Sequence, residues 1–159
     1  MAKTKKTNAM RLLEKEGIDF ETITYGTKDG KIDGISVAAK IGRAPEWVFK
    51  TLVAEGASGD HLVFVIPVTS ELDLKKAAKV AGEKKVQMIH VKDILKLTGY
   101  IRGGCSHIGM KKHFPTFIDQ SAEALEKIVV SGGMIGLQME LSPPDLLKAA
   151  GGKYADLVK

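Results

Sequence analysis

One lysine interrupts an otherwise apolar stretch of the sequence. Lys50 separates residues 47–49 (Trp-Val-Phe) from residues 51–53 (Thr-Leu-Val), and on a strand it would share a face with Val48 and Leu52 because side chains alternate with a period of two. A cation partly removed from water interacts strongly with a carbonyl oxygen or a phosphate, since the local dielectric constant is low. A lysine that covers a sheet edge with its alkyl stem and keeps its ammonium in water would show the same pattern.

Two glycine pairs could bring backbone amides close to a ligand. They are Gly103-Gly104 and the Gly132-Gly133 pair that follows Ser131. Because glycine has no Cβ, its N–H group can approach a ligand closely and form an anion-binding nest or an oxyanion hole. Simple turns would use the same residues.

A lone thiol lies two residues from an imidazole. Cys105 and His107 would point the same way in extended chain, and an imidazole can draw the proton from a neighbouring thiol. A small buried thiol without a chemical role is the alternative.

The sequence carries no recognised metal or cofactor motif. Cys105, His107 and His113 are three possible metal ligands, but their spacing matches no recognised metal site. The phosphate-loop, dinucleotide, H-E-x-x-H and C-x-x-C motifs are absent. We therefore expect no metal and no cofactor.

Composition indicates a single globular domain. The chain has 159 residues, a net charge of +5 and 44% apolar residues, so one core is expected over residues 7–159, preceded by a basic, flexible tail at 1–6. One cysteine excludes an internal disulfide and favours the cytoplasm, and no run approaches the roughly 20 apolar residues of a membrane span. Lysine pairs at 84–85 and 111–112 could follow an RNA backbone or simply be solvated.

Local patterns predict an α+β fold with a mixed, curved or barrel-like sheet flanked by helices. Ser36, Ser70 and Ser142 are the expected N-caps of three of the helices. Expected helices cover residues 7–17, 36–41, 70–82, 91–97 and 142–150, and expected strands cover 18–25, 48–54, 62–66, 86–89, 116–118, 128–131 and 137–141.

Several ordered motifs together resemble one known family, YbaK/EbsC. Such a set is more specific than any single motif, and it runs in family order from near Tyr25 to Leu141. The motifs are Lys50-Thr51-Leu52, residues 72–79 (Leu-Asp-Leu-Lys-Lys-Ala-Ala-Lys), Thr98-Gly99-Tyr100, Gly103-Gly104-Cys105-Ser106 with residues 109–112 (Gly-Met-Lys-Lys), and Val130-Ser131-Gly132-Gly133.

The resemblance implies a relative of the editing module of bacterial prolyl-tRNA synthetases. Such a protein would act in trans as an aminoacyl-tRNA deacylase, most characteristically on cysteine attached to tRNA(Pro), with no metal and no enzyme nucleophile. The thiol of the substrate would attack its own ester carbonyl, and holding the two groups together can supply much of the rate. Expected partners are tRNA(Pro) and prolyl-tRNA synthetase.

The family pattern also implies roles for individual residues. Lys50 would fix the terminal adenosine or its phosphate and polarise the ester, and the amides of Gly103 and Gly104 would stabilise the oxyanion. Ser131 completes the expected catalytic set. The expected substrate-binding residues are Tyr25, Thr51, Ser106, Gly132 and Gln138.

Two positions depart from the cysteine-specific pattern: Gln138 stands in place of an aspartate and His107 in place of a proline. Three functions are therefore in competition. The first is the deacylase, the second is a non-catalytic tRNA- or synthetase-binding adaptor on the same fold, and the third is a hydrolase with Cys105 as nucleophile and His107 as base.

Overall fold

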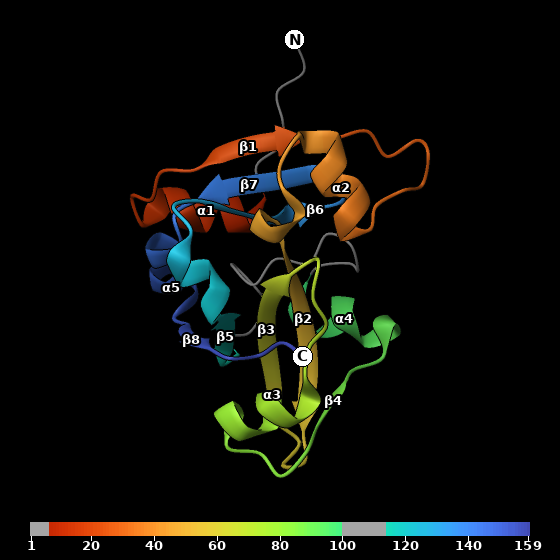
Figure 1. Cartoon of the computed structure of the whole chain (residues 1–159), viewed down its shortest axis with the longest axis vertical. Helices are drawn as coiled ribbons and strands as arrows, with labels where there is room; N and C mark the ends of the chain where they lie inside the picture. The colour runs from red at the N-terminus through yellow and green to blue at the C-terminus, as the bar shows by residue number, and fades with distance from the viewer. Residues whose placement is uncertain (1–6, 100–113) are drawn as a thin grey trace.

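The computed structural model describes residues 7–99 and 114–159, which form two β-sheets flanked by helices (Figure 1). The smaller sheet has the order β1-β7-β6 and is antiparallel throughout. Its strands are β1 (Glu21–Thr24), β6 (Ile128–Met134) and β7 (Leu137–Leu141). The predicted hairpin of the last two strands is confirmed, with Gly136 in its turn at a φ of 92°.

The larger sheet has the order β4-β2-β3-β5-β8. Strand β2 pairs antiparallel with both β3 and β4, whereas β3, β5 and β8 run parallel, so the predicted mixed sheet is confirmed. Its strands are β2 (Phe49–Gly56), β3 (His61–Pro67), β4 (Val86–Met88), β5 (Thr116–Asp119) and β8 (Lys153–Ala155).

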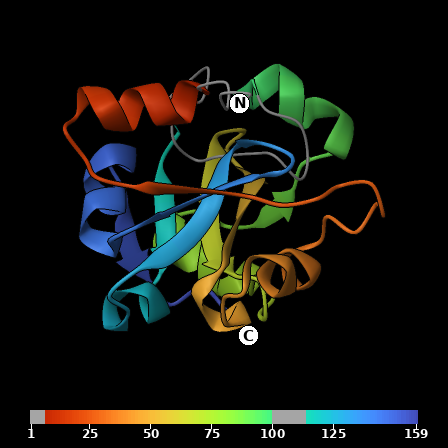
Figure 2. The ribbon, with the colours of Figure 1, turned by 90° about the horizontal axis from the view of Figure 1, so that it is seen from above.

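Five α-helices surround the sheets in the described part of the chain. Figure 2 shows α1 and α5 on one side of the molecule and α2 and α4 on the other. Their bounds are α1 (Asn8–Lys15), α2 (Gly34–Ile41), α3 (Leu74–Ala81), α4 (Val91–Thr98) and α5 (Pro143–Ala150), with short 3-10 turns at η1 (Pro45–Trp47) and η2 (Gln120–Ala124).

Two of the three predicted serine caps, Ser36 and Ser70, are wrong. In these two helices an aspartate carboxylate accepts instead: Asp33 caps α2 and Asp73 caps α3. Ser142 occupies the N-cap position of α5 but makes no side-chain cap hydrogen bond. An ionised carboxylate is the stronger acceptor for N–H groups at a helix N-terminus, which explains why the nearby aspartates take this position.

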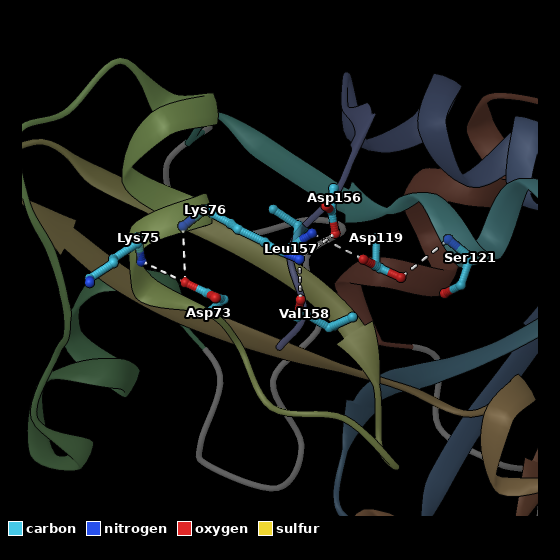
Figure 3. A network of polar contacts seen from close by, with 8 residues as sticks. All are labelled: Asp73, Lys75, Lys76, Asp119, Ser121, Asp156, Leu157 and Val158. Carbon is cyan, nitrogen blue, oxygen red and sulfur yellow. Dashed lines mark hydrogen bonds and ion pairs between the residues drawn. The ribbon is translucent and has the colours of Figure 1, made fainter.

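The C-terminal segment closes the larger sheet through polar contacts that the sequence patterns did not predict. Lys76 donates to the Asp156 carboxylate (3.1 Å) and to a main-chain carbonyl, and the main-chain N–H of Leu157 donates to the buried Asp119 (3.1 Å) (Figure 3). These bonds bring Leu157 into the core and hold β8 beside β5. Strand β8 was missed because its three residues are too short to show a period.

The largest apolar cluster packs the two sheets together. It contains Phe49 and Val63 of the larger sheet, Ile128 and Met139 of the smaller sheet, and Leu13 of α1. A second cluster, around Phe64, packs α3 against the larger sheet. In the described residues no helix is long and apolar enough to cross a membrane.

Candidate functional site

A cavity of about 320 Å³ opens where the two sheets meet. Polar groups and apolar side chains both line it, as expected for a site that must hold a charged ligand and exclude water. The lining residues are Ile32, Asp33, Gly34, Val37, Phe49, Lys50, Thr51, Leu52, Val68, Ser131 and Gln138.

Lys50 and Ser131 reach this cavity from different sheets. A single parallel bridge joins Val48, just before β2, to Val129 on β6. Lys50 lies two residues after Val48, and Ser131 lies two residues after Val129, so each side chain points to the same side as its bridged residue. Both side chains line the cavity. Lys50 is half-buried, and no hydrogen bond or ion pair to its ammonium is found among residues 7–99 and 114–159. Leu52, which was predicted to share a face with Lys50, also lines the cavity, whereas Val48 does not.

The hairpin places a second polar side chain beside Ser131. Gln138 pairs in register with Ser131 and is only 6% exposed, yet its side-chain amide has no hydrogen-bond partner in the part of the chain that the structure describes. Its side chain lines the cavity, so the amide can be reached by a ligand there. Gln138 thus offers one donor and one acceptor to a molecule in the cavity.

The bulge after Ser131 is built from close contacts. The Ser131 hydroxyl accepts a hydrogen bond from the Gly133 N–H (3.2 Å), and Gly133 has a φ of 100°, which favours glycine. A Cβ on Gly132 would lie 2.7 Å from Cγ of Leu137. The Gly132 carbonyl accepts a hydrogen bond from Thr7, the cap of α1, so this helix holds the serine loop in place.

The N-terminal end of α2 supplies a wall that the motif analysis missed. Asp33 and Gly34 line the cavity, and Gly34 packs so closely on Val68 that a Cβ would lie 2.2 Å from its Cγ1 atom. Apolar side chains such as Val37 and Val68 carry no chemical signature, so only their three-dimensional neighbourhood reveals them. The one available signal was Asp33-Gly34, a capping residue followed by a glycine.

Not every predicted site residue meets at the cavity. Thr51 lines it, whereas Tyr25 is not among the lining residues, and the Tyr25 hydroxyl is buried without a partner in the described residues. The predicted Gly103, Gly104 and Ser106, together with the alternative pair Cys105 and His107, lie outside the described residues.

Two other cavities lack this combination of groups. One of about 400 Å³ contains Arg43 and Glu140, but these charges satisfy each other through a 2.6 Å ion pair, which raises the pKa of Arg43. The other, about 270 Å³, is lined by His61, His90 and Asp93, among others. Within residues 7–99 and 114–159, no group of three His, Cys, Asp or Glu side chains could hold a metal ion.

Comparison with known proteins assigns the chain to a family. The model of the aminoacyl-tRNA editing domain matches residues 33–149, which include all but one of the residues that line the cavity. The chain belongs to the aminoacyl-tRNA editing family. A protein of Enterococcus faecalis named "Putative Cys-tRNA(Pro)/Cys-tRNA(Cys) deacylase EbsC" is 44% identical over 99% of this chain and 98% of its own length, which places the chain with the YbaK/EbsC editing proteins.

Solved structures agree with this editing fold. The structure of "hypothetical protein APE2540" superposes with a TM-score of 0.88 at 22% identity, over 96% of this chain and all of that one. A structure described as "a putative trans-editing enzyme for prolyl tRNA synthetase" reaches a TM-score of 0.85, also at 22% identity, over 96% of this chain and 95% of that one. At this identity the two structures confirm the predicted fold class alone.

Proposed function

We propose that the protein is a trans-editing deacylase that releases cysteine from mischarged tRNA(Pro). Family membership supports aminoacyl-tRNA as the substrate class, and the name of the Enterococcus relative supports cysteine as the amino acid. The structural observation that carries the proposal is the ammonium of Lys50, which has no partner within residues 7–99 and 114–159 and lies with Ser131 and Gln138 in a cavity of about 320 Å³.

The chemistry would be an intramolecular displacement. The thiol sulfur of the bound cysteine attacks its ester carbonyl, the bond from that carbon to the ribose oxygen breaks, and the thiol proton passes to this leaving oxygen. The products are a cyclic thioester of cysteine and tRNA with a free hydroxyl. Lys50 contributes positive charge next to the carbonyl or the terminal phosphate, where charge builds up in the transition state. A protein nucleophile is not needed, because proximity of thiol and carbonyl replaces it.

Ser131 and Gln138 would orient the aminoacyl group. The hydroxyl of Ser131 already accepts from Gly133, so it is positioned before a ligand arrives. The Gln138 amide can accept from the α-ammonium group of the amino acid and donate to an oxygen. The amides of Gly103 and Gly104 are proposed as the oxyanion donors, on the strength of the sequence motif alone.

The decisive experiment compares ester hydrolysis of Cys-tRNA(Pro), Ala-tRNA(Pro) and Pro-tRNA(Pro), each with and without prolyl-tRNA synthetase. We expect cysteine to be released fastest and proline not at all. Replacing Lys50 with methionine keeps the apolar stem but removes the charge, so kcat/KM should fall by about 100-fold or more. Lys148→Met, at an exposed position of α5, is the matched control and should leave the rate unchanged.

Three outcomes would contradict the proposal in different ways. Absence of turnover on all three substrates, with tRNA binding that survives Lys50→Met, would indicate the adaptor. Loss of activity in Cys105→Ala would indicate a cysteine nucleophile, whereas the proposed displacement expects a near-normal rate. Faster release of alanine than of cysteine would show that the thiol of the substrate does not take part in the reaction.

A further inference from the structure

The loop between β1 and α2 forms one rim of the cavity. This loop covers residues 25–33 and projects from the body of the molecule beside α2 (Figures 1 and 2). Its last residues, Ile32 and Asp33, line the cavity directly. Any chain that is attached to a ligand in the cavity must leave past one of its rims.

Lys40 on α2 holds the loop through three hydrogen bonds. Its ammonium donates to the main-chain carbonyls of Gly26 (2.7 Å) and Lys31 (2.8 Å) and to the carboxylate of Asp29 (2.7 Å). All three of its N–H donors are therefore used within the loop. The same ammonium lies 5.9 Å from the ring centroid of Tyr25. A single cation thus ties both ends of the loop to one helix.

The carboxylates of the loop are engaged, but two of its cations are not. The hydrogen bond from Lys40 lowers the pKa of Asp29, and the hydrogen bonds from Ser36 lower the pKa of Asp33. Lys28 and Lys31 are exposed, and neither side chain forms an ion pair with any residue in the described ranges 7–99 and 114–159. The loop consequently presents two free ammonium groups on a constrained backbone next to the cavity.

We propose that this loop binds the phosphates of the single-stranded 3′ end of tRNA, with Lys28 and Lys31 as the contacts and Lys40 as the positioning residue. The inference rests on the proposed function, because the aminoacyl group in the cavity is joined to a ribose-phosphate chain that has to exit nearby. Lysine recognises phosphate as a point charge, and a constrained loop loses less conformational freedom on binding than a flexible one.

RNA binding tests this without requiring turnover. The probe is an uncharged tRNA(Pro) acceptor-stem hairpin that carries the 3′ overhang, and a blunt hairpin without the overhang is the second probe. We expect the double variant Lys28→Ala/Lys31→Ala to raise Kd for the overhang probe roughly three- to tenfold, the sum of two exposed charge pairs. For this double variant, the slope of log K against the logarithm of the salt concentration should become less negative by about 1.4, because two single-strand phosphate contacts are lost.

The matched control is Lys84→Ala/Lys85→Ala. It removes the same charge from an exposed turn between α3 and β4, at the opposite end of the larger sheet from the loop (Figure 1). Equal weakening by both double variants, or equal weakening of the overhang and blunt probes, would refute the proposal. Normal overhang-dependent binding by a protein that hydrolyses no ester would instead refute the proposed function and leave this inference standing.

The positioning role of Lys40 needs a separate readout. Lys40→Met should raise Kd for the overhang probe and speed hydrogen exchange at the amides of Gly30 and Lys31, because the loop loses its three tethers. Lys28→Ala/Lys31→Ala should leave this exchange unchanged, since those side chains hold nothing in place. Unaltered exchange and unaltered Kd in Lys40→Met would show that the tethers do not position the loop.

Discussion

Replacing Gly34 with alanine is expected to destabilise the protein, although alanine is the better helix former. Gly34 is the first residue of α2 and has no left-handed backbone conformation that would require glycine. Its obstacle is space: an added Cβ would lie 2.2 Å from Cγ1 and 2.5 Å from Cβ of Val68. Because the Cβ of Val68 is fixed to its backbone, rotation of the side chain cannot remove this contact.

Two opposing effects decide the magnitude. Gly→Ala in a helix gains up to about 1 kcal/mol from propensity and reduced freedom of the unfolded chain. Overpacking costs roughly 1–3 kcal/mol when neighbouring backbone has to move. Contacts of 2.2 and 2.5 Å place the cost in the upper part of this range, about 2–3 kcal/mol. After a gain of up to about 1 kcal/mol, the free energy of unfolding should fall by about 1–2 kcal/mol, and Tm by roughly 2–8 °C.

Urea unfolding followed by circular dichroism measures this change, as a lower midpoint with an unchanged slope. Gly26→Ala is the control, because Gly26 has an ordinary φ and nothing within 4 Å of the built Cβ. Adding Val68→Gly to Gly34→Ala should cost less than the sum of the two single changes, since the clash is then absent. A Gly34→Ala protein as stable as the parent, or strict additivity in the double variant, would refute the steric account.

Two further predictions concern the core and the helix caps. Met139→Ala, at a fully buried position, should lower the free energy of unfolding by roughly 2–5 kcal/mol. Met88→Ala, at a residue that is 44% exposed, should change the free energy of unfolding far less. Equal effects of the two substitutions would contradict the assigned burial. Hydrogen bonds from the N–H groups of Lys76 and Lys75 lower the pKa of Asp73 from 3.8. The ionised carboxylate therefore contributes its full stabilisation of the folded state above pH 3.8, and this stabilisation is lost as pH falls through the lower, folded-state pKa. The stability difference between the parent and Asp73→Ala should therefore be constant from pH 7 to pH 5 and shrink below about pH 4; a difference that persists at lower pH would show that the carboxylate is not the source.

Sequence patterns were sufficient for most elements of the fold, and they singled out Lys50, which lines the cavity. The paired core strands, the helix stops at Gly42 and Gly82 and the final hairpin are all confirmed, because local periodicity and left-handed glycines report on them directly. Lys50 could be singled out because a charge within an apolar strand conflicts with its surroundings. The caps were misjudged because serine and aspartate compete for the same position, and only the local geometry decides between them.

The composition of the cavity could not be read in the same way. Val68 and Val37 look like any other core residue, and Lys40 looks like one more solvated helix lysine. Their importance depends on contacts with segments that a sequence pattern does not relate, such as the three loop groups that Lys40 binds. The family motifs indicated Ser131 and Gln138, but their register across the hairpin is a property of the pairing.

The site occupies this place because one main-chain bridge joins the two sheets and the bridged strands then diverge. After the bridge between Val48 and Val129, β2 continues in the larger sheet beside β3, while β6 turns back through the bulge that follows Ser131. Two strands that diverge leave space that side chains must fill or a ligand can occupy. Here the residues just past the bridge include Lys50 and Ser131, whose polar side chains line this space and do not fill it. A charged site can therefore form without interrupting either apolar core, which explains how one domain of this size accommodates both.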